Sequence, residues 1–113
     1  MFSGDTAYFP DLAGFGQGAD LLVHEAMLEA AIELLLARVG NGDERLRAHF
    51  YTAHSTAAEA AWIAVAANVK ALALKHLIPS DDPDFGEAEW LAAIRSIWDI
   101  PFYLGHDGLR IAF

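Results

Sequence analysis

The sequence predicts a single α/β domain over residues 1–113, because short apolar runs alternate with longer segments of helical spacing. The two runs that predict buried strands are residues 21–24 and 71–74. The segments between and after them are long enough to be crossover helices. We therefore expect parallel strands in one sheet, with helices packed against it.

The clearest element is a helix that begins at Thr56. Thr56 and Glu59 have the spacing of a capping box, in which each side chain bonds the other residue's backbone N–H. Ala60, Ile63 and Ala64 then form one apolar face at helical spacing. The other expected elements are a strand at 1–3, a loop or short helix at 10–18, helices at 26–39, 44–50 and 87–98, a loop at 78–86, and a hairpin that joins 102–104 to 109–111 around Asp107 and Gly108.

The composition is apolar and acidic at once. Apolar residues make up 55% of the chain, against about 45–50% in a typical soluble domain. We therefore expect both faces of the sheet to be covered, or an apolar face to pack on another chain. The net charge of −9 argues against nucleic-acid binding by the isolated chain, because an acidic surface repels phosphates.

Cysteine usage and the N-terminal residues bear on the compartment. The chain has no cysteine, which excludes disulfides and thiolate metal sites and fits a reducing cytoplasm. Residues 1–5 show no signal-peptide character, and no apolar run approaches the roughly 18 residues of a membrane span. We therefore expect a cytoplasmic protein that does not cross a membrane.

Polar side chains follow each predicted strand. Asp5 comes after the first strand, His24 and Glu25 come after the second, and His76 comes after the third. His54 precedes the capped helix. Because sites in open α/β sheets gather beyond the C-terminal ends of the strands, we expect these groups to share one edge.

Each of these residues also has a structural interpretation. Asp5 can serve a turn or a cap, and His24 can bond the backbone at a strand end. His54 and His76 can be ordinary loop residues. The remaining candidates are interpreted as non-functional: His49 and His106 as surface or turn histidines, Trp62, Trp90 and Trp98 as core or interface residues, and the glycines at 14–18 as a poor match to a phosphate-binding GxGxxG loop.

Four short motifs occur in an order that is typical of one known family. They are Gly4-Asp5-Thr6, His24-Glu25-Ala26, His54-Ser55-Thr56 and the segment 75–79, which reads KHLIP. In this order they resemble the C-terminal half of the metallo-β-lactamase superfamily, especially the branch that includes ribonuclease Z. The resemblance covers essentially the whole chain. It implies half of an αββα sandwich: one mixed sheet with helices packed mainly on one face.

The resemblance implies a role for four residues. Asp5 matches the carboxylate that bridges two metal ions, and His76 matches the last histidine ligand. His54 matches the histidine that assists proton transfer or binds the scissile phosphate, and Glu25 matches the acid that orients it. The chemistry suits these roles, since a carboxylate can bind two cations and a Glu beside a His fixes its tautomer.

The main metal motif of that family, HxHxDH, does not occur in the sequence. A catalytic zinc usually has three protein ligands, and Asp5 and His76 supply two of them. His54 or His24 could add a third, although the resemblance does not place either among the residues that contact the metal. We therefore expect an incomplete site for zinc, manganese or iron, with weak metal binding by a monomer or none.

Three functional hypotheses are compatible with this incomplete ligand set. In the first, the chain is a metal-dependent hydrolase fragment that is inactive or weakly active without a complementing N-terminal half. Alternatively it is a non-catalytic homodimeric structural or binding protein that descends from such a hydrolase. A third alternative is a small hydrolase whose metal site is shared across a dimer. The sequence does not indicate the substrate.

Overall fold

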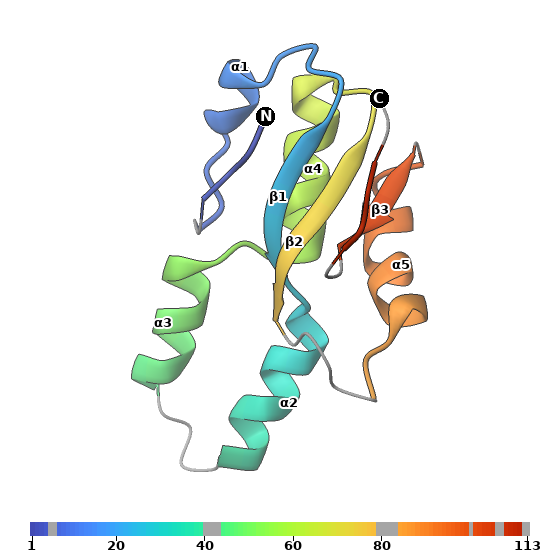
Figure 1. Cartoon of the computed structure of the whole chain (residues 1–113). Helices are drawn as coiled ribbons and strands as arrows, with labels where there is room; N and C mark the ends of the chain where they lie inside the picture. Colours follow the sequence, from blue (N-terminus) through green and yellow to red (C-terminus); the bar gives the residue numbers. More distant parts are fainter. Residues whose placement is uncertain (5–6, 40–43, 79–83, 100, 106–107, 112–113) are drawn as a thin grey trace.

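The computed structural model describes residues 1–4, 7–39, 44–78, 84–99, 101–105 and 108–111 (Figure 1). The elements in chain order are α1 (Leu12–Phe15), β1 (Leu22–Met27), α2 (Glu29–Val39), α3 (Glu44–Ala53), α4 (Ala57–Ala67), β2 (Leu72–Ile78), α5 (Glu87–Arg95) and β3 (Phe102–Leu104).

The sheet has the order β1-β2-β3, and both pairs of strands are parallel. The expected α/β class is confirmed, but the expected mixed sheet is wrong for the strands described. Residues 108–111 form no strand, and Asp107 lies outside the described residues. The expected strand at 1–3 is reduced to a parallel bridge between Phe2 and Val23, beside β1.

The strands β1 and β2 both run further than the sequence predicts. Ala26 pairs with Leu77 and Met27 with Ile78, so β1 continues into the segment predicted as helix, and α2 begins at Glu29. The prediction was wrong at these two residues because a short apolar run suits either a buried strand or the first turn of a helix. Pairing with β2 decides in favour of a strand, and the local sequence gives no information on that pairing.

The predicted capping box at the start of α4 is confirmed. The hydroxyl oxygen of Thr56 accepts a bond from the Glu59 N–H at 3.1 Å, and the Glu59 carboxylate accepts one from the Thr56 N–H at 2.9 Å. The buried face of α4 includes the predicted Ala60, Ile63 and Ala64. Figure 1 shows α4 lying along one face of β1 and β2, with α5 beside it.

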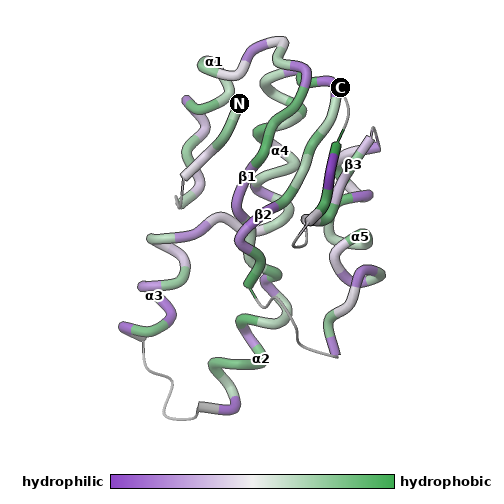
Figure 2. The backbone as a smooth tube through the Cα atoms, in the orientation of Figure 1, coloured by the Kyte–Doolittle hydropathy of each residue, from purple (hydrophilic) through white to green (hydrophobic). Residues whose placement is uncertain are grey.

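The main core lies between this helical layer and the sheet. Trp90, Ile94 and Trp98 are buried there, and the helix predicted over 87–98 ends earlier, at Arg95. Figure 2 shows the apolar character of β1 and β2, the two strands that this core covers. Trp62, in contrast, is half exposed on the outer side of α4.

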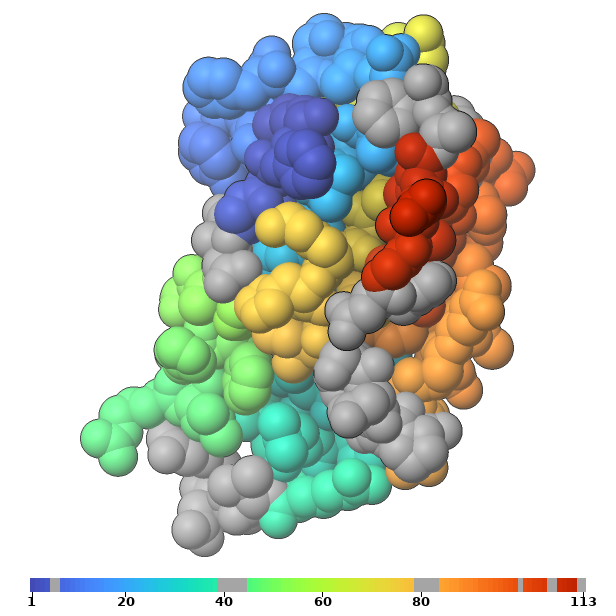
Figure 3. Space-filling view, viewed as in Figure 1, coloured from blue at the N-terminus to red at the C-terminus, as the bar shows by residue number. Residues whose placement is uncertain are grey.

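The opposite face of the sheet carries a smaller apolar cluster. Leu21, Ala71 and Ala73 are buried there, with Val23 and Tyr103 partly buried against them. No helix is described on this face. In Figure 3 the first residues of the chain and the C-terminal segment lie at either side of it, with β2 between them. Helices on mainly one face therefore agree with the expected half of a sandwich.

An ion pair joins α2 to α3. The Arg47 guanidinium and the Tyr51 hydroxyl both donate to the Glu33 carboxylate, with bonds of 2.7 Å. Arg47 and then Tyr51 hold the pKa of Glu33 below its ordinary value of 4.5, because both bonds favour the ionised form. Burial, and then the Glu33 carboxylate, raise the pKa of Tyr51.

This pKa shift predicts a pH-dependent contribution to stability. Because the folded-state pKa of Glu33 is depressed, its contribution is present above pH 4.5 and is lost as the pH falls through the folded value. We expect Glu33→Gln to flatten the acid limb of a stability–pH profile measured by urea unfolding. Glu87→Gln, at an exposed carboxylate of α5, is the control and should leave that limb unchanged.

Candidate functional site

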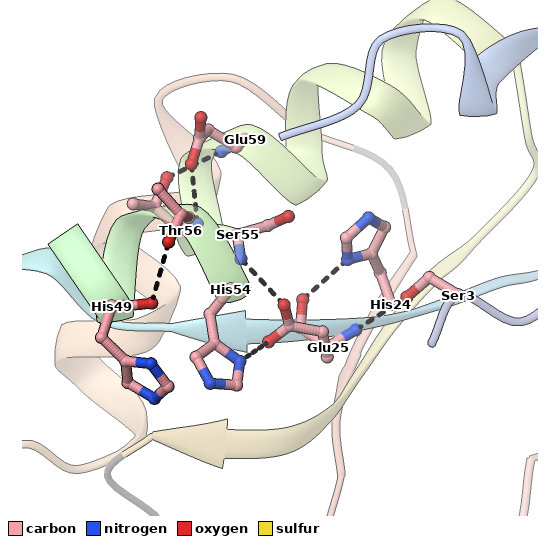
Figure 4. Close-up of polar contacts among 9 residues, drawn as sticks. Ser3, His24, Glu25, His49, His54, Ser55, Thr56 and Glu59 are labelled. Atoms are coloured by element: carbon pink, nitrogen blue, oxygen red, sulfur yellow. Dashed lines mark hydrogen bonds and ion pairs between the residues drawn. The ribbon is translucent and has the colours of Figure 1, made fainter. Parts of the chain in front are cut away.

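Three segments meet where β1 and β2 approach their C-terminal ends. Glu25 comes from β1, His76 from β2, and His54 from the segment between α3 and α4. A bond of 2.8 Å from the Met27 N–H to the Ser55 carbonyl fastens that segment to the end of β1. Figure 4 shows His54 and Ser55 lying against Glu25.

The carboxylate of Glu25 is completely buried, with 0% of the residue exposed. Its Oε1 accepts a bond of 2.8 Å from the Ser55 N–H, and its Oε2 lies 3.4 Å from Nδ1 of His54. The Glu25 N–H donates to the Ser3 hydroxyl at 3.1 Å. A buried carboxylate is costly unless it has partners, so the contacts with Ser55 and His54 fix its direction. The bond to Ser3 holds the backbone of Glu25 instead.

The orientation of His54 follows from that carboxylate. Its side chain is 13% exposed, and Nδ1 faces Glu25 (Figure 4). A proton on Nδ1 then points at the carboxylate, which leaves the lone pair on Nε2. The imidazole is therefore arranged to accept a proton at Nε2, and Glu25 would stabilise the resulting cation.

His24 has a different environment from the other histidines. It is buried, and Nδ1 donates to the backbone carbonyl of Glu25 at 2.7 Å. Burial lowers its pKa, because the charged form loses hydration. The structural interpretation, a histidine bonded to the backbone, therefore holds, although His24 and Glu25 lie inside β1 rather than after it.

His76 occupies a bulge in β2. Glu25 pairs with Lys75 and Ala26 pairs with Leu77, so the register with β1 passes over His76, which is the extra residue of β2. Its φ of 48° lies in the left-handed region, which costs a residue with a Cβ about 1–2 kcal/mol. Bulges and strained residues of this kind recur beside functional sites. The sequence placed His76 after the strand, whereas the structure has it within β2.

The bulge residue lies beside His54. The two imidazole rings have centroids 5.9 Å apart. Glu25, His54 and His76 each offer one ligand atom, and these atoms lie within 4.8 Å of one another. One carboxylate and two imidazoles suit zinc, iron or manganese, so the donor set fits a metal ion. Asp5, the other predicted metal ligand, lies outside the described residues.

Sequence reasoning missed two contributors to this site. Ser3 and the backbone N–H of Ser55 both bond Glu25, and neither has a sequence signal beyond its place in a motif. It also assigned His49 to the surface. His49 is indeed exposed on α3, but its ring centroid is 6.5 Å from that of His54. The other histidine placed at the surface, His106, lies outside the described residues.

No described helix is long and apolar enough to cross a membrane.

Comparison with known proteins gives sequence relatives of one kind. Ribonuclease Z of Picrophilus torridus is 40% identical over 76 residues, 67% of this chain and 20% of that protein. Ribonuclease Z of Brevibacillus brevis is 39% identical over 101 residues, 87% of this chain and 28% of the relative. Ribonuclease Z of Myxococcus xanthus is 34% identical over 111 residues, 98% and 31% respectively. No protein-family profile matches the chain.

A solved structure agrees on the fold. The metallo-β-lactamase fold protein YhfI from Bacillus subtilis superposes with a TM-score of 0.65 at 21% identity, over 96% of this chain and 37% of that one. The chain is therefore similar in sequence to part of several ribonuclease Z proteins and shares the fold of a metallo-β-lactamase fold protein. It spans between 20% and 31% of the length of the curated relatives named above.

The left-handed backbone at His76 gives a test of the bulge in this metallo-β-lactamase-like sheet. Glycine adopts that conformation without strain, so His76→Gly should cost less stability than Lys75→Gly, its neighbour in β2, by about 1 kcal/mol. The measurement is urea unfolding of both variants and the wild type. An equal loss in the two variants would show that residue 76 is unstrained.

Proposed function

We propose that this chain supplies the C-terminal part of the active site of a metal-dependent phosphodiester hydrolase. The observation that carries the proposal is the buried Glu25 carboxylate, which faces His54 at 3.4 Å beside the bulge residue His76. The relatives are ribonucleases by name, and a ribonuclease cleaves phosphodiesters of RNA.

In this proposal Glu25 orients the imidazole of His54, and His54 transfers the proton. Glu25 holds Nδ1 of His54, so Nε2 can take a proton from the attacking water or return one to the leaving oxygen. Burial strengthens the attraction between the carboxylate and the imidazolium, because little water screens it. The arrangement is the acid–histidine part of a catalytic triad, with a carboxylate that orients the base.

His76 is the proposed metal ligand of this chain, together with Asp5. When bound, zinc, manganese or iron would polarise a phosphoryl oxygen and lower the pKa of a coordinated water toward about 7. His76 suits this role because it is exposed beside His54, whereas Glu25 is enclosed. A metal bound at Glu25 would have to displace the bond from Ser55 to Oε1 or enter a fully buried space.

The two proposed ligands are too few for a catalytic ion. Asp5 and His76 are two ligands, and a catalytic zinc usually has three from protein. We therefore infer that activity requires further ligands from another polypeptide segment that carries HxHxDH, and that the chain alone has little or no turnover.

The division of roles can be tested with a chain complemented by a ribonuclease Z segment that carries HxHxDH. Metal bound to the native state must raise the melting temperature. We expect His76→Ala to remove the rise caused by zinc or manganese. His54→Ala should keep the rise but slow the hydrolysis of bis(p-nitrophenyl) phosphate by about 10²–10⁴-fold, the usual worth of a general acid or base.

Two variants complete the design. Glu25→Gln should keep the metal effect and lower kcat, because the amide no longer stabilises the imidazolium. Asp20→Asn, an exposed carboxylate near the other end of β1, is the control and should change neither reading. Loss of the metal effect in all three site variants would contradict this assignment and indicate a single ion held by Glu25, His54 and His76 together.

The apolar sheet face is the proposed contact with a partner. Leu21, Ala71 and Ala73, with Tyr103 at the margin, form the cluster on the face without described helices. In a two-sheet sandwich this face would pack against a second sheet. A second copy of the chain can supply that sheet in a two-fold dimer, and a complementing N-terminal half can supply it in a heterodimer.

The native mass measured with the metal content separates the functional alternatives. The shared-site hydrolase predicts a homodimer with stoichiometric metal, whereas the non-catalytic binding protein predicts a dimer whose stability ignores metal. The hydrolase fragment predicts a complex with the HxHxDH segment. Tyr103→Glu, which places a charge at the margin of the sheet cluster, should weaken whichever complex forms. A stable monomer that does not associate with that segment would rule out all three.

A further inference from the structure

An open hollow of about 590 Å³ lies directly beside His54. Tyr8, Phe9 and His49 line it together with His54, and Thr52 adds a hydroxyl. The hollow is within the size range of small-ligand sites, about 300–1,000 Å³. None of the roles described above uses Tyr8, Phe9 or His49.

The lining is aromatic and held in place. Tyr8 is 41% exposed and Phe9 is 45% exposed. The Tyr8 ring meets the Trp62 ring of α4 edge to face, with centroids 6.0 Å apart. The Phe9 carbonyl accepts a bond of 3.0 Å from the Leu12 N–H at the start of α1, which anchors its backbone. Exposed aromatic rings on an anchored backbone offer flat surfaces for stacking.

The position of the hollow indicates what it binds. His54 is both a wall of the hollow and the proposed proton carrier, so a group in the hollow is next to the reacting phosphate. His49 stands almost perpendicular to His54, at 84°. Proteins hold unpaired bases by stacking them on Phe, Tyr, Trp or His side chains.

We propose that this hollow is a subsite for the nucleobase next to the scissile phosphate, with Phe9 and Tyr8 as its stacking surfaces. The inference deepens the proposed function and rests on it for the placement of the phosphate at His54. The ligand is a nucleoside phosphate, either free or as the end of a strand. The chain's net charge of −9 disfavours long polyanions, which favours a ligand with few phosphates.

Binding is tested without turnover, by titrating adenosine 5′-monophosphate or ribose 5-phosphate into the isotope-labelled chain and following amide shifts by NMR. The two probes differ only in the base. We expect the nucleotide to bind more tightly and to shift the amides of residues 7–9 and 49–54. Phe9→Ala should weaken nucleotide binding by about tenfold or more, the usual effect of losing a stacked ring, and leave ribose 5-phosphate unchanged.

A matched control is available on α1. Phe15→Ala removes the same side chain from a position that is 81% exposed and does not line the hollow, so nucleotide affinity should not change. Equal affinity for the two probes, or equal affinity of the Phe9→Ala variant and the wild type, would overturn the subsite. Because Phe9 is exposed, the variant should keep the wild-type melting temperature.

A tetranucleotide distinguishes the two sources of the base. Tighter binding of the tetranucleotide than of the mononucleotide assigns the subsite to a strand end, and equal binding assigns it to a free nucleotide. Both results support the subsite if Phe9→Ala weakens them alike. The binding titrations do not depend on the result of the hydrolysis experiment. If the complemented chain hydrolyses its substrate but Phe9→Ala does not change nucleotide binding, the subsite is wrong and the proposed function stands.

Discussion

The burial of one carboxylate determines how this site is built. Glu25 has no exposed surface, and an ion in that position is costly unless its oxygens are satisfied. Ser55 and His54 lie against those oxygens, so the segment between α3 and α4 is held to the end of β1. The next residue, Thr56, caps α4. The stretch from His54 to Thr56 therefore fixes both the imidazole and the start of the helix that covers the sheet.

The bulge in β2 brings the third residue of the site, His76, beside His54. The register between β1 and β2 shifts by one residue directly after Glu25, and His76 is the extra residue. Pairing resumes between Ala26 and Leu77, so the two strands stay paired beyond the bulge. His76 meanwhile lies beside His54. A regular strand would need no left-handed residue here. The strain at His76 thus accompanies its approach to the site.

The sequence predicted what local patterns encode and missed what pairing decides. The Thr56–Glu59 capping box was predictable because its partners are three residues apart. The extension of β1 over Ala26 and Met27 was not, since apolar residues there suit a helix or a strand. The grouping of Glu25, His54 and His76 was predictable from strand order and the family resemblance. The bond between Ser3 and Glu25 and the bulge in β2 depend on contacts between segments that are distant in sequence. No local sequence pattern indicates such contacts.

The two parts of the proposed chemistry depend on different amounts of protein. The Glu25–His54 pair and its supports come from β1, from Ser3 near the N-terminus and from the segment before α4, so the described residues orient the imidazole by themselves. The proposed metal ligands are divided, because His76 and Asp5, which we propose as ligands, are fewer than a catalytic ion requires. This difference explains how a chain that spans 20–31% of its named relatives can fold around an oriented base. In the proposed site, proton transfer is prepared within the chain, whereas metal affinity depends on what the sheet packs against.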